Sequence, residues 1–306
     1  MKVITAGNPY IDIDAYASCL AYRELLKLKG EPAKAVSTSK LNESISPSLR
    51  EIDLHLDEYI PNENDEFIIL DLSNPKCFDK IVNLGKVIEI VDHHPGFEHL
   101  WQNLPNATIE PIGAIATLIF EKYQTANLLD KMSPEIAKLL ASAILDNTLD
   151  FNAKITTNRD KDAYQEISKL ASLKPDFAKN YFLECQKSIE NNLTGAILDD
   201  VKTEQRDYEL PGVFGQLTIW DGEKILAQKT EIEKALNSLG RKWLINIIVL
   251  SEKKSYILVS DESVRKTVAK LFNIDPPEDN LIKLDSLWLR KEIIKKALSD
   301  LPTTKK

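Results

Sequence analysis

The feature that most constrains the fold is an alternation of short apolar runs and helical patterns in the first half of the chain. The apolar runs have the length of buried strands and lie at residues 3–6, 33–36, 67–70 and 87–91. Apolar residues at helical spacing occur at residues 15–28, 114–123 and 134–145. Strands that alternate with helices are typical of a parallel sheet. We therefore predict an α/β N-terminal domain with a parallel sheet and helices on both faces.

The pattern changes near residue 188. Beyond it, apolar runs at residues 217–220, 245–250 and 255–259 predict strands, the last two joined as a hairpin. Helical patterns follow or intervene at residues 230–239, 264–271 and 290–298. A chain of 306 residues is long enough for two domains. We predict a first domain at residues 1–188 and a smaller α+β domain at residues 189–306.

Polar clusters come directly after the predicted strands and at one helix end of the first half. Their acidic and histidine members are Asp12, Asp14, Asp71, Asp92, His93, His94 and Asp146, with Asn8 after the first strand. Ligands of open α/β sheets bind outside the carboxyl ends of the strands. We therefore expect these side chains to converge at that edge of the sheet.

Each cluster also has a purely structural interpretation. Asp12 and Asp14 suit the cap and first turn of a helix, and Asp71 suits a turn after a strand. The adjacent histidines could be a structural pair. Asp146 lies at the negative end of a helix, which is unfavourable unless a cation compensates.

Several acids in one crevice favour a metal site. Two carboxylates about 4 Å apart repel by roughly 4 kcal/mol at an effective dielectric constant of 20. Such groups must take up protons or bind cations. Oxygen ligands with one or two imidazoles and no thiolate suit Mn²⁺ or Mg²⁺. An aspartate shared between two ions would give a dinuclear site of the kind that hydrolyses phosphoester or phosphoanhydride bonds.

The composition limits the classes of molecule that this protein is expected to bind and the compartment in which it is expected to work. The net charge of −8 argues against a polymeric nucleic acid or a membrane surface as partner, since both favour basic proteins. Three scattered cysteines without a CxxC pair fit a reducing compartment. The apolar runs are too short to span a membrane, and the N-terminus is too short and too acidic for a signal peptide. We expect a cytoplasmic protein, and the sequence leaves its oligomeric state open.

As a set, the clusters resemble the four motifs of the DHH phosphoesterase superfamily, in the same order and at similar spacing. The resemblance covers residues 1 to about 185 and includes Gly113–Thr117, the stretch from Asp146 to Phe151, and Thr156, Thr157 and Asp160. It implies two divalent ions, Mn²⁺ or Mg²⁺. One ion would bind Asp12 and Asp71 beside Asn8, which also faces the substrate. The other would bind Asp14, Asp71, His93 and Asp146.

The resemblance also implies roles beyond metal binding. Asp71 would bridge the two ions, and a water between them would be the nucleophile. Asp92 would orient His93 through its second ring nitrogen. His94 would contact a phosphate oxygen or the leaving group.

The second domain is more loosely similar to the C-terminal domain of family II inorganic pyrophosphatases, yeast-type exopolyphosphatases and prune proteins. This similarity implies that Lys202, Arg290 and Lys291 bind phosphate. Leu289 falls where the pyrophosphatases have arginine, so the choice between Arg290 and Lys291 stays open.

The pyrophosphatases carry histidine at the position of Asn8, whereas exopolyphosphatases and prune proteins carry asparagine. We therefore expect a metal-dependent phosphoanhydride hydrolase acting on short polyphosphate, a small anionic substrate. The alternatives are a manganese-dependent inorganic pyrophosphatase, a nucleotide or oligonucleotide phosphodiesterase, and a non-enzymatic family member that binds partners.

Overall fold

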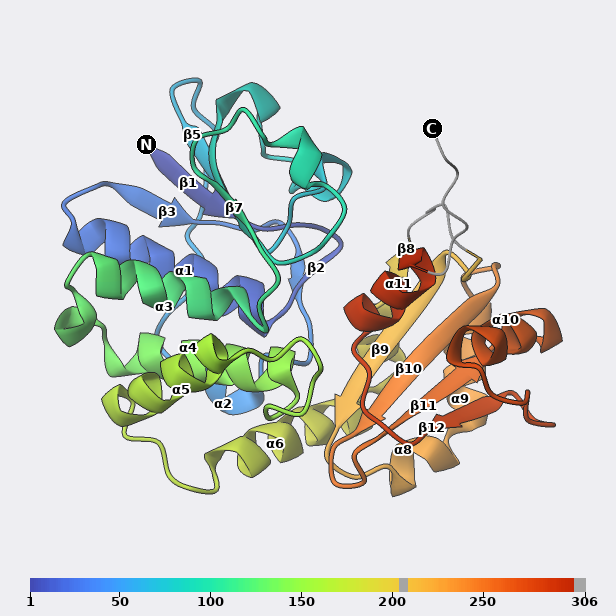
Figure 1. Ribbon diagram of the computed structural model, residues 1–306. Coiled ribbons are helices and arrows are strands. Elements are labelled where there is room, and N and C mark those ends of the chain that lie inside the picture. The colour runs from blue at the N-terminus through green and yellow to red at the C-terminus, as the bar shows by residue number, and fades with distance from the viewer. Residues whose placement is uncertain (204–208, 300–306) are drawn as a thin grey trace. The chain divides into compact units, whose positions relative to one another are not determined.

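The computed structural model describes residues 1–203 and 209–299, and the chain divides into two compact units, Met1–Tyr181 and Phe182–Lys306 (Figure 1). The division falls within helix α6 (Phe177–Asn191), before the boundary that we predicted between residues 188 and 189. Each unit has its own sheet and is described by itself.

The sheet of unit 1 is parallel, as predicted, and has five strands. Their order is β3 (Ala33–Ala35), β1 (Lys2–Thr5), β5 (Glu66–Leu70), β6 (Val87–Asp92) and β7 (Ala107–Ile109). All neighbouring pairs run parallel, so the carboxyl ends of β1, β5 and β6 lie at one edge. Strand β7 was not predicted, because three residues are too few to give a periodic pattern. A separate pair, β2 (Tyr10–Ile11) and β4 (Lys40–Leu41), lies beyond β1 in the sequence.

The helices of unit 1 are α1 (Ile13–Leu28), α2 (Pro47–Arg50), α3 (Ile115–Thr125), α4 (Pro134–Thr148) and α5 (Asn158–Leu170). Helices α1 and α3 run beside the sheet, and α4 and α5 form a further layer (Figure 1). Ser133 caps α4 and Pro134 occupies its first turn. Because α4 contacts α1, α3 and α5, it is apolar almost all round.

The second face of this sheet differs from our prediction. Val3, Phe67, Ile69 and Ile90 pack there against side chains from loops and short 3₁₀ turns, namely Leu72, Phe78, Ile81, Val82, Trp101 and Leu104. Helices were expected on both faces. The link between β5 and β6 contains Asn74, Pro75 and Asn83, which start two 3₁₀ turns at residues 75–77 and 84–86. These turn formers prevent a regular helix.

Unit 2 contains the predicted second sheet, which is mixed. Its order is β12 (Leu281–Leu284), β11 (Lys254–Val259), β10 (Trp243–Val249), β9 (Val213–Ile219) and β8 (Lys202–Thr203). Strands β10 and β11 form the predicted antiparallel hairpin, while β9 and β10 run parallel.

Helices cover both faces of this second sheet. They are α7 (Leu193–Leu198), α8 (Glu223–Ala227), α9 (Lys229–Asn237), α10 (Glu262–Phe272) and α11 (Arg290–Ser299). Every residue of β10 is buried, since its two faces contribute to two separate apolar clusters. In the described ranges of both units, none of the helices combines the length and hydropathy needed to cross a membrane.

Candidate metal centre

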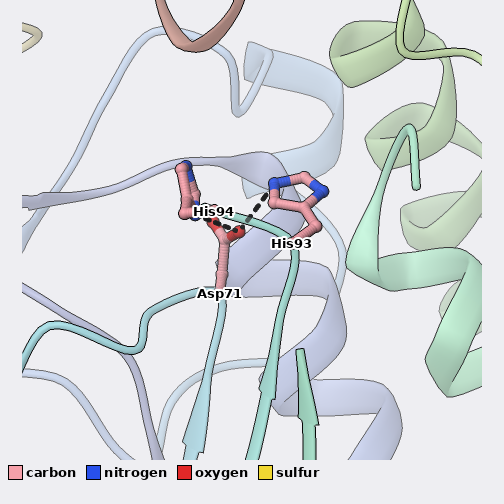
Figure 2. A group of neighbouring side chains, drawn as sticks. All are labelled: Asp71, His93 and His94. Carbon is pink, nitrogen blue, oxygen red and sulfur yellow. Dashed lines mark ion pairs between the residues drawn. The ribbon is translucent and has the colours of Figure 1, made fainter. Parts of the chain in front are cut away.

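The carboxyl ends of β5 and β6 bring three potential metal ligands together. Asp71, His93 and His94 each offer one ligand atom, and these atoms all lie within 4.8 Å of one another (Figure 2). Asp71 Oδ1 lies 3.2 Å from His93 Nε2 and 3.8 Å from His94 Nδ1. One carboxylate and two imidazoles form a donor set that suits a divalent transition metal such as Mn²⁺. The group as a whole fits a divalent cation. Asp71 and His93 are predicted metal ligands, whereas His94 was predicted to contact the substrate.

Local backbone conformation places Asp71 at this edge. Its φ angle is +61°, in the left-handed region, which aspartate tolerates better than most residues. Its N–H donates to the Val91 carbonyl at 2.8 Å, which joins the end of β5 to β6. The side chain is only 8% exposed. The predicted turn former and the predicted ligand are thus the same residue.

The Asp92 carboxylate contacts the ring of His94, whereas we expected it to orient the ring of His93. Its Oδ1 accepts the N–H groups of His93 and His94 at 2.7 and 3.1 Å, and lies 2.8 Å from Nδ1 of the His94 ring. We had predicted that Asp92 orients His93. The carboxylate instead folds back over the next two N–H groups, and this turn directs it to His94.

The Asp92 side chain is strongly favoured in its ionised form. Burial opposes the ionised form, but the His94 imidazole, aided by His93 and the Ser73 hydroxyl, holds the pKa of this carboxyl at about 2. The two histidine rings meet edge to face, with centroids 4.7 Å apart. Their side chains are 1% exposed for His93 and 25% exposed for His94. His94 is therefore the ring that a small molecule from solvent can reach.

Asp12 and Asp14 serve the starts of two different helices. Asp12 caps α1, with Oδ1 accepting the Ala15 N–H at 3.1 Å. Asp14 is fully buried, and its two oxygens accept the N–H groups of Ile115 and Ala116 at the start of α3, both at 2.9 Å. The capping interpretation thus applies to Asp12. A carboxylate oxygen retains a second lone pair in such bonds, so metal binding by both residues stays a prediction.

Asp146 lies in the last turn of α4, which contains no basic residue. Its Oδ1 is 3.1 Å from the Tyr181 hydroxyl, which also donates to the Ser44 carbonyl at 2.7 Å. We did not anticipate Tyr181. It lies in an ordinary amphipathic pattern, so the sequence carries no signal that separates it from other core residues.

Asn8 is exposed, and both ends of its amide are held. Its Oδ1 accepts the Ser39 hydroxyl at 2.5 Å, and its Nδ2 donates to the Phe78 carbonyl at 3.1 Å. Its place beside a metal and a substrate stays a prediction.

Asp160 is a second residue whose role we did not predict. It is fully buried and accepts the N–H groups of Gly113, Ala114 and Thr157 at 3.1, 3.3 and 2.8 Å, and the Thr117 hydroxyl at 2.7 Å. A Cβ atom on Gly113 would lie 2.7 Å from Asp160 Oδ2, so this approach requires glycine. Asp160 thereby fixes the start of α3, where Asp14 binds.

The predicted phosphate ligands of unit 2 have different surroundings. Arg290 is buried, with its guanidinium 2.9 Å from Asp200 Oδ1 and donating to the carbonyls of Asp200 and Phe214 at 2.6 and 3.0 Å. Lys202 and Lys291 are half-buried. Arg290 is therefore already engaged within its own unit, and phosphate binding by the three residues stays a prediction.

Comparison with known proteins agrees with this geometry. Residues 2–144 match the model of the DHH family, N-terminal domain. The predicted resemblance to this family is confirmed over these residues, which include Asp71, Asp92 and both adjacent histidines.

Relatives of similar length match across almost the whole chain. A Bacillus cereus protein named "Probable manganese-dependent inorganic pyrophosphatase" is 24% identical and covers 98% of both chains. A Staphylococcus carnosus protein of the same name is 26% identical and covers 94% of this chain and 95% of its own.

Two solved structures share the fold. A Methanococcus jannaschii chain assigned as a family II inorganic pyrophosphatase has a TM-score of 0.74 and 22% identity, over 97% of this chain and all of its own. An exopolyphosphatase-related protein of Bacteroides fragilis has a TM-score of 0.53 and 18% identity, over 97% of this chain and 90% of its own. The predicted fold class, a parallel-sheet domain followed by a smaller α+β domain, is confirmed.

Proposed function

We propose that this protein is a divalent-metal-dependent hydrolase of phosphoanhydride bonds, with short inorganic polyphosphate as its substrate. The observation that carries the proposal is the convergence of Asp71, His93 and His94 at the carboxyl edge of a DHH family domain. Full-length relatives named as manganese-dependent inorganic pyrophosphatases support the reaction class and the metal.

The metal centre would supply a bound water of lowered pKa and positive charge for the phosphate oxygens. Asp71 and His93, both almost fully buried, would hold the ions away from bulk solvent. Asp12, Asp14 and Asp146 would complete the two ligand sets. Lys202 and Lys291, with Arg290, would bind phosphate oxygens.

Asp92 and His94 would handle the leaving group. An ionised Asp92 accepts a hydrogen bond from the Nδ1–H group of His94, which leaves Nε2 as the ring atom available to the substrate. A protonated His94 ring would carry a second N–H group, at Nε2, that can donate a hydrogen bond to the leaving phosphate. His94 would thus be a catalytic residue and Asp92 its positioning residue.

The presence of asparagine rather than histidine at position 8 supports polyphosphate, rather than pyrophosphate, as the substrate. A neutral amide is a harder donor than the imidazole that pyrophosphatases carry there, so Mg²⁺ is expected to be tolerated as well as Mn²⁺. Pyrophosphate is the second candidate substrate, which the names of the relatives favour.

The test is phosphate release from tripolyphosphate, pyrophosphate and a dinucleotide, each with Mg²⁺ and with Mn²⁺. We expect kcat/KM for tripolyphosphate to exceed that for pyrophosphate at least tenfold, with both metals active. The reverse order would establish the pyrophosphatase alternative. Hydrolysis of the dinucleotide alone would overturn the proposal, and no hydrolysis of any compound would favour a partner-binding protein.

A further inference from the structure

Tyr181 connects two segments that are distant in the sequence. Its side chain is buried, at 3% exposure. The hydroxyl lies 2.7 Å from the Ser44 carbonyl and 3.1 Å from Asp146 Oδ1, which are 137 and 35 residues away in the chain. A hydroxyl has one hydrogen, so the two acceptors share it. The ring is thereby held between the loop after β4 and the last turn of α4.

Ser44 extends this connection to the first acidic cluster. Its Oγ accepts the Ile13 N–H at 2.9 Å and donates to Asn42 Oδ1 at 2.6 Å. Ile13 is the residue between Asp12 and Asp14. A continuous series of hydrogen-bonded groups therefore runs from the segment of Asp12 and Asp14, through Ser44 and Tyr181, to Asp146.

Asp146 lies where a carboxylate is electrostatically unfavourable, so the hydrogen bond from the Tyr181 hydroxyl stabilises it. A carboxylate at the C-terminal end of a helix faces the negative end of the helix dipole. The last turn of α4 provides no lysine or arginine to offset it. The Tyr181 hydroxyl supplies a donor at this end, and it limits the directions in which the carboxylate can point.

Tyr181 also belongs to the helix that connects the two units. Helix α6 begins at Phe177 in unit 1 and ends at Asn191 in unit 2. Its buried residues include Tyr181, Phe182, Cys185 and Ile189. The hydrogen bond between Asp146 and the Tyr181 hydroxyl therefore links the last turn of α4 to α6.

We propose that Tyr181 is a positioning residue of the metal centre: its hydroxyl fixes Asp146 relative to the Asp12–Asp14 segment and makes the order of α6 depend on divalent metal. The proposal rests on the proposed function insofar as Asp146 is a metal ligand. Partners that orient metal ligands typically contribute about 10–100-fold to metal affinity.

The test compares Tyr181→Phe with a matched control, Tyr59→Phe. Tyr59 also donates to an aspartate, Asp65, at 2.8 Å, but Asp65 precedes β5 and so lies at the opposite edge of the sheet from Asp71. Mn²⁺ affinity is measured by calorimetry, and amide hydrogen exchange of residues 177–184 is followed with and without Mn²⁺. We expect Tyr181→Phe to weaken Mn²⁺ binding about tenfold and to abolish Mn²⁺-dependent protection of α6. Tyr59→Phe is expected to change neither.

Further variants separate the ways in which the proposal can fail. Ser44→Ala removes the Ile13 contact and is expected to weaken Mn²⁺ binding by a smaller factor, which provides a second test if Tyr181→Phe does not fold. Affinity within twofold of the natural protein for folded Tyr181→Phe, or for Asp146→Asn, would overturn the proposal. Weakened Mn²⁺ binding in Tyr181→Phe, together with no hydrolysis by the natural protein, would sustain it while the proposed function fails.

Discussion

Buried charge is handled differently in the two units. In unit 2, the buried Arg290 guanidinium faces Asp200 at 2.9 Å, so a permanent positive charge meets the carboxylate. In unit 1, the neighbours of Asp71 are the imidazoles of His93 and His94, which are charged only if protonated. The first arrangement is neutral by itself, and the second can accept a cation. The difference teaches that the identity of the partner, rather than burial alone, makes Asp71 a candidate metal ligand and Asp200 a structural acid.

The largest expected effect is that of Asp71→Asn. The amide keeps the size of the side chain but removes the charge shared by the two predicted ions, so Mn²⁺ affinity and kcat/KM are expected to fall by more than the 10–100-fold that orienting partners contribute. Calorimetry and phosphate release measure both quantities. Turnover close to that of the natural protein would show that Asp71, like Asp200, is a structural acid and not a metal ligand.

Arg290→Met and Lys291→Met separate a structural role from a substrate-binding role within unit 2. Loss of Arg290 leaves Asp200 without its guanidinium, so the free energy of unfolding is expected to fall by about 3 kcal/mol. Lys291→Met is expected to change stability by less than about 0.5 kcal/mol while raising KM for the phosphate substrate. Urea unfolding and steady-state kinetics provide the readouts. If Arg290→Met unfolds at the same urea concentration as the natural protein, the contacts of Arg290 within unit 2 do not stabilise the fold.

An effect on stability smaller than that of Arg290→Met is expected for Asp92, and it depends on pH. Because the pKa of Asp92 is lowered to about 2, its ionised form stabilises the folded state above the unfolded pKa, and this contribution is lost as pH falls toward 2. In EDTA, Asp92→Asn is expected to lower the free energy of unfolding by about 2 kcal/mol at pH 7. The difference from the natural protein should stay constant down to about pH 5 and shrink below pH 4. A difference that grows with acidity would show that Asp92 is not stabilised as an anion.

The sequence predicted what depends on local patterns. Apolar runs and helical spacing located the strands β1, β5 and β6 and the helices α1 and α4, and the positions of acids after strands led to Asp71, Asp92 and His93. These features are short-range, so they are visible in the sequence.

The remaining features depend on tertiary contacts. The loops that replace helices on the second face of the sheet pack through scattered residues such as Phe78 and Trp101. Asp92 contacts the ring of His94, and the sequence alone does not distinguish between the two adjacent histidines. Tyr181 and Arg290 find their partners 137 and 90 residues away, and no local pattern indicates such pairs.

The most direct test is a crystal of the protein grown with Mn²⁺ and measured at the manganese absorption edge. The account predicts two anomalous peaks in each chain at the carboxyl ends of β5 and β6, with Asp71 bound to both ions and His93 bound to one. Absence of anomalous density beside Asp71 at saturating Mn²⁺ would contradict it.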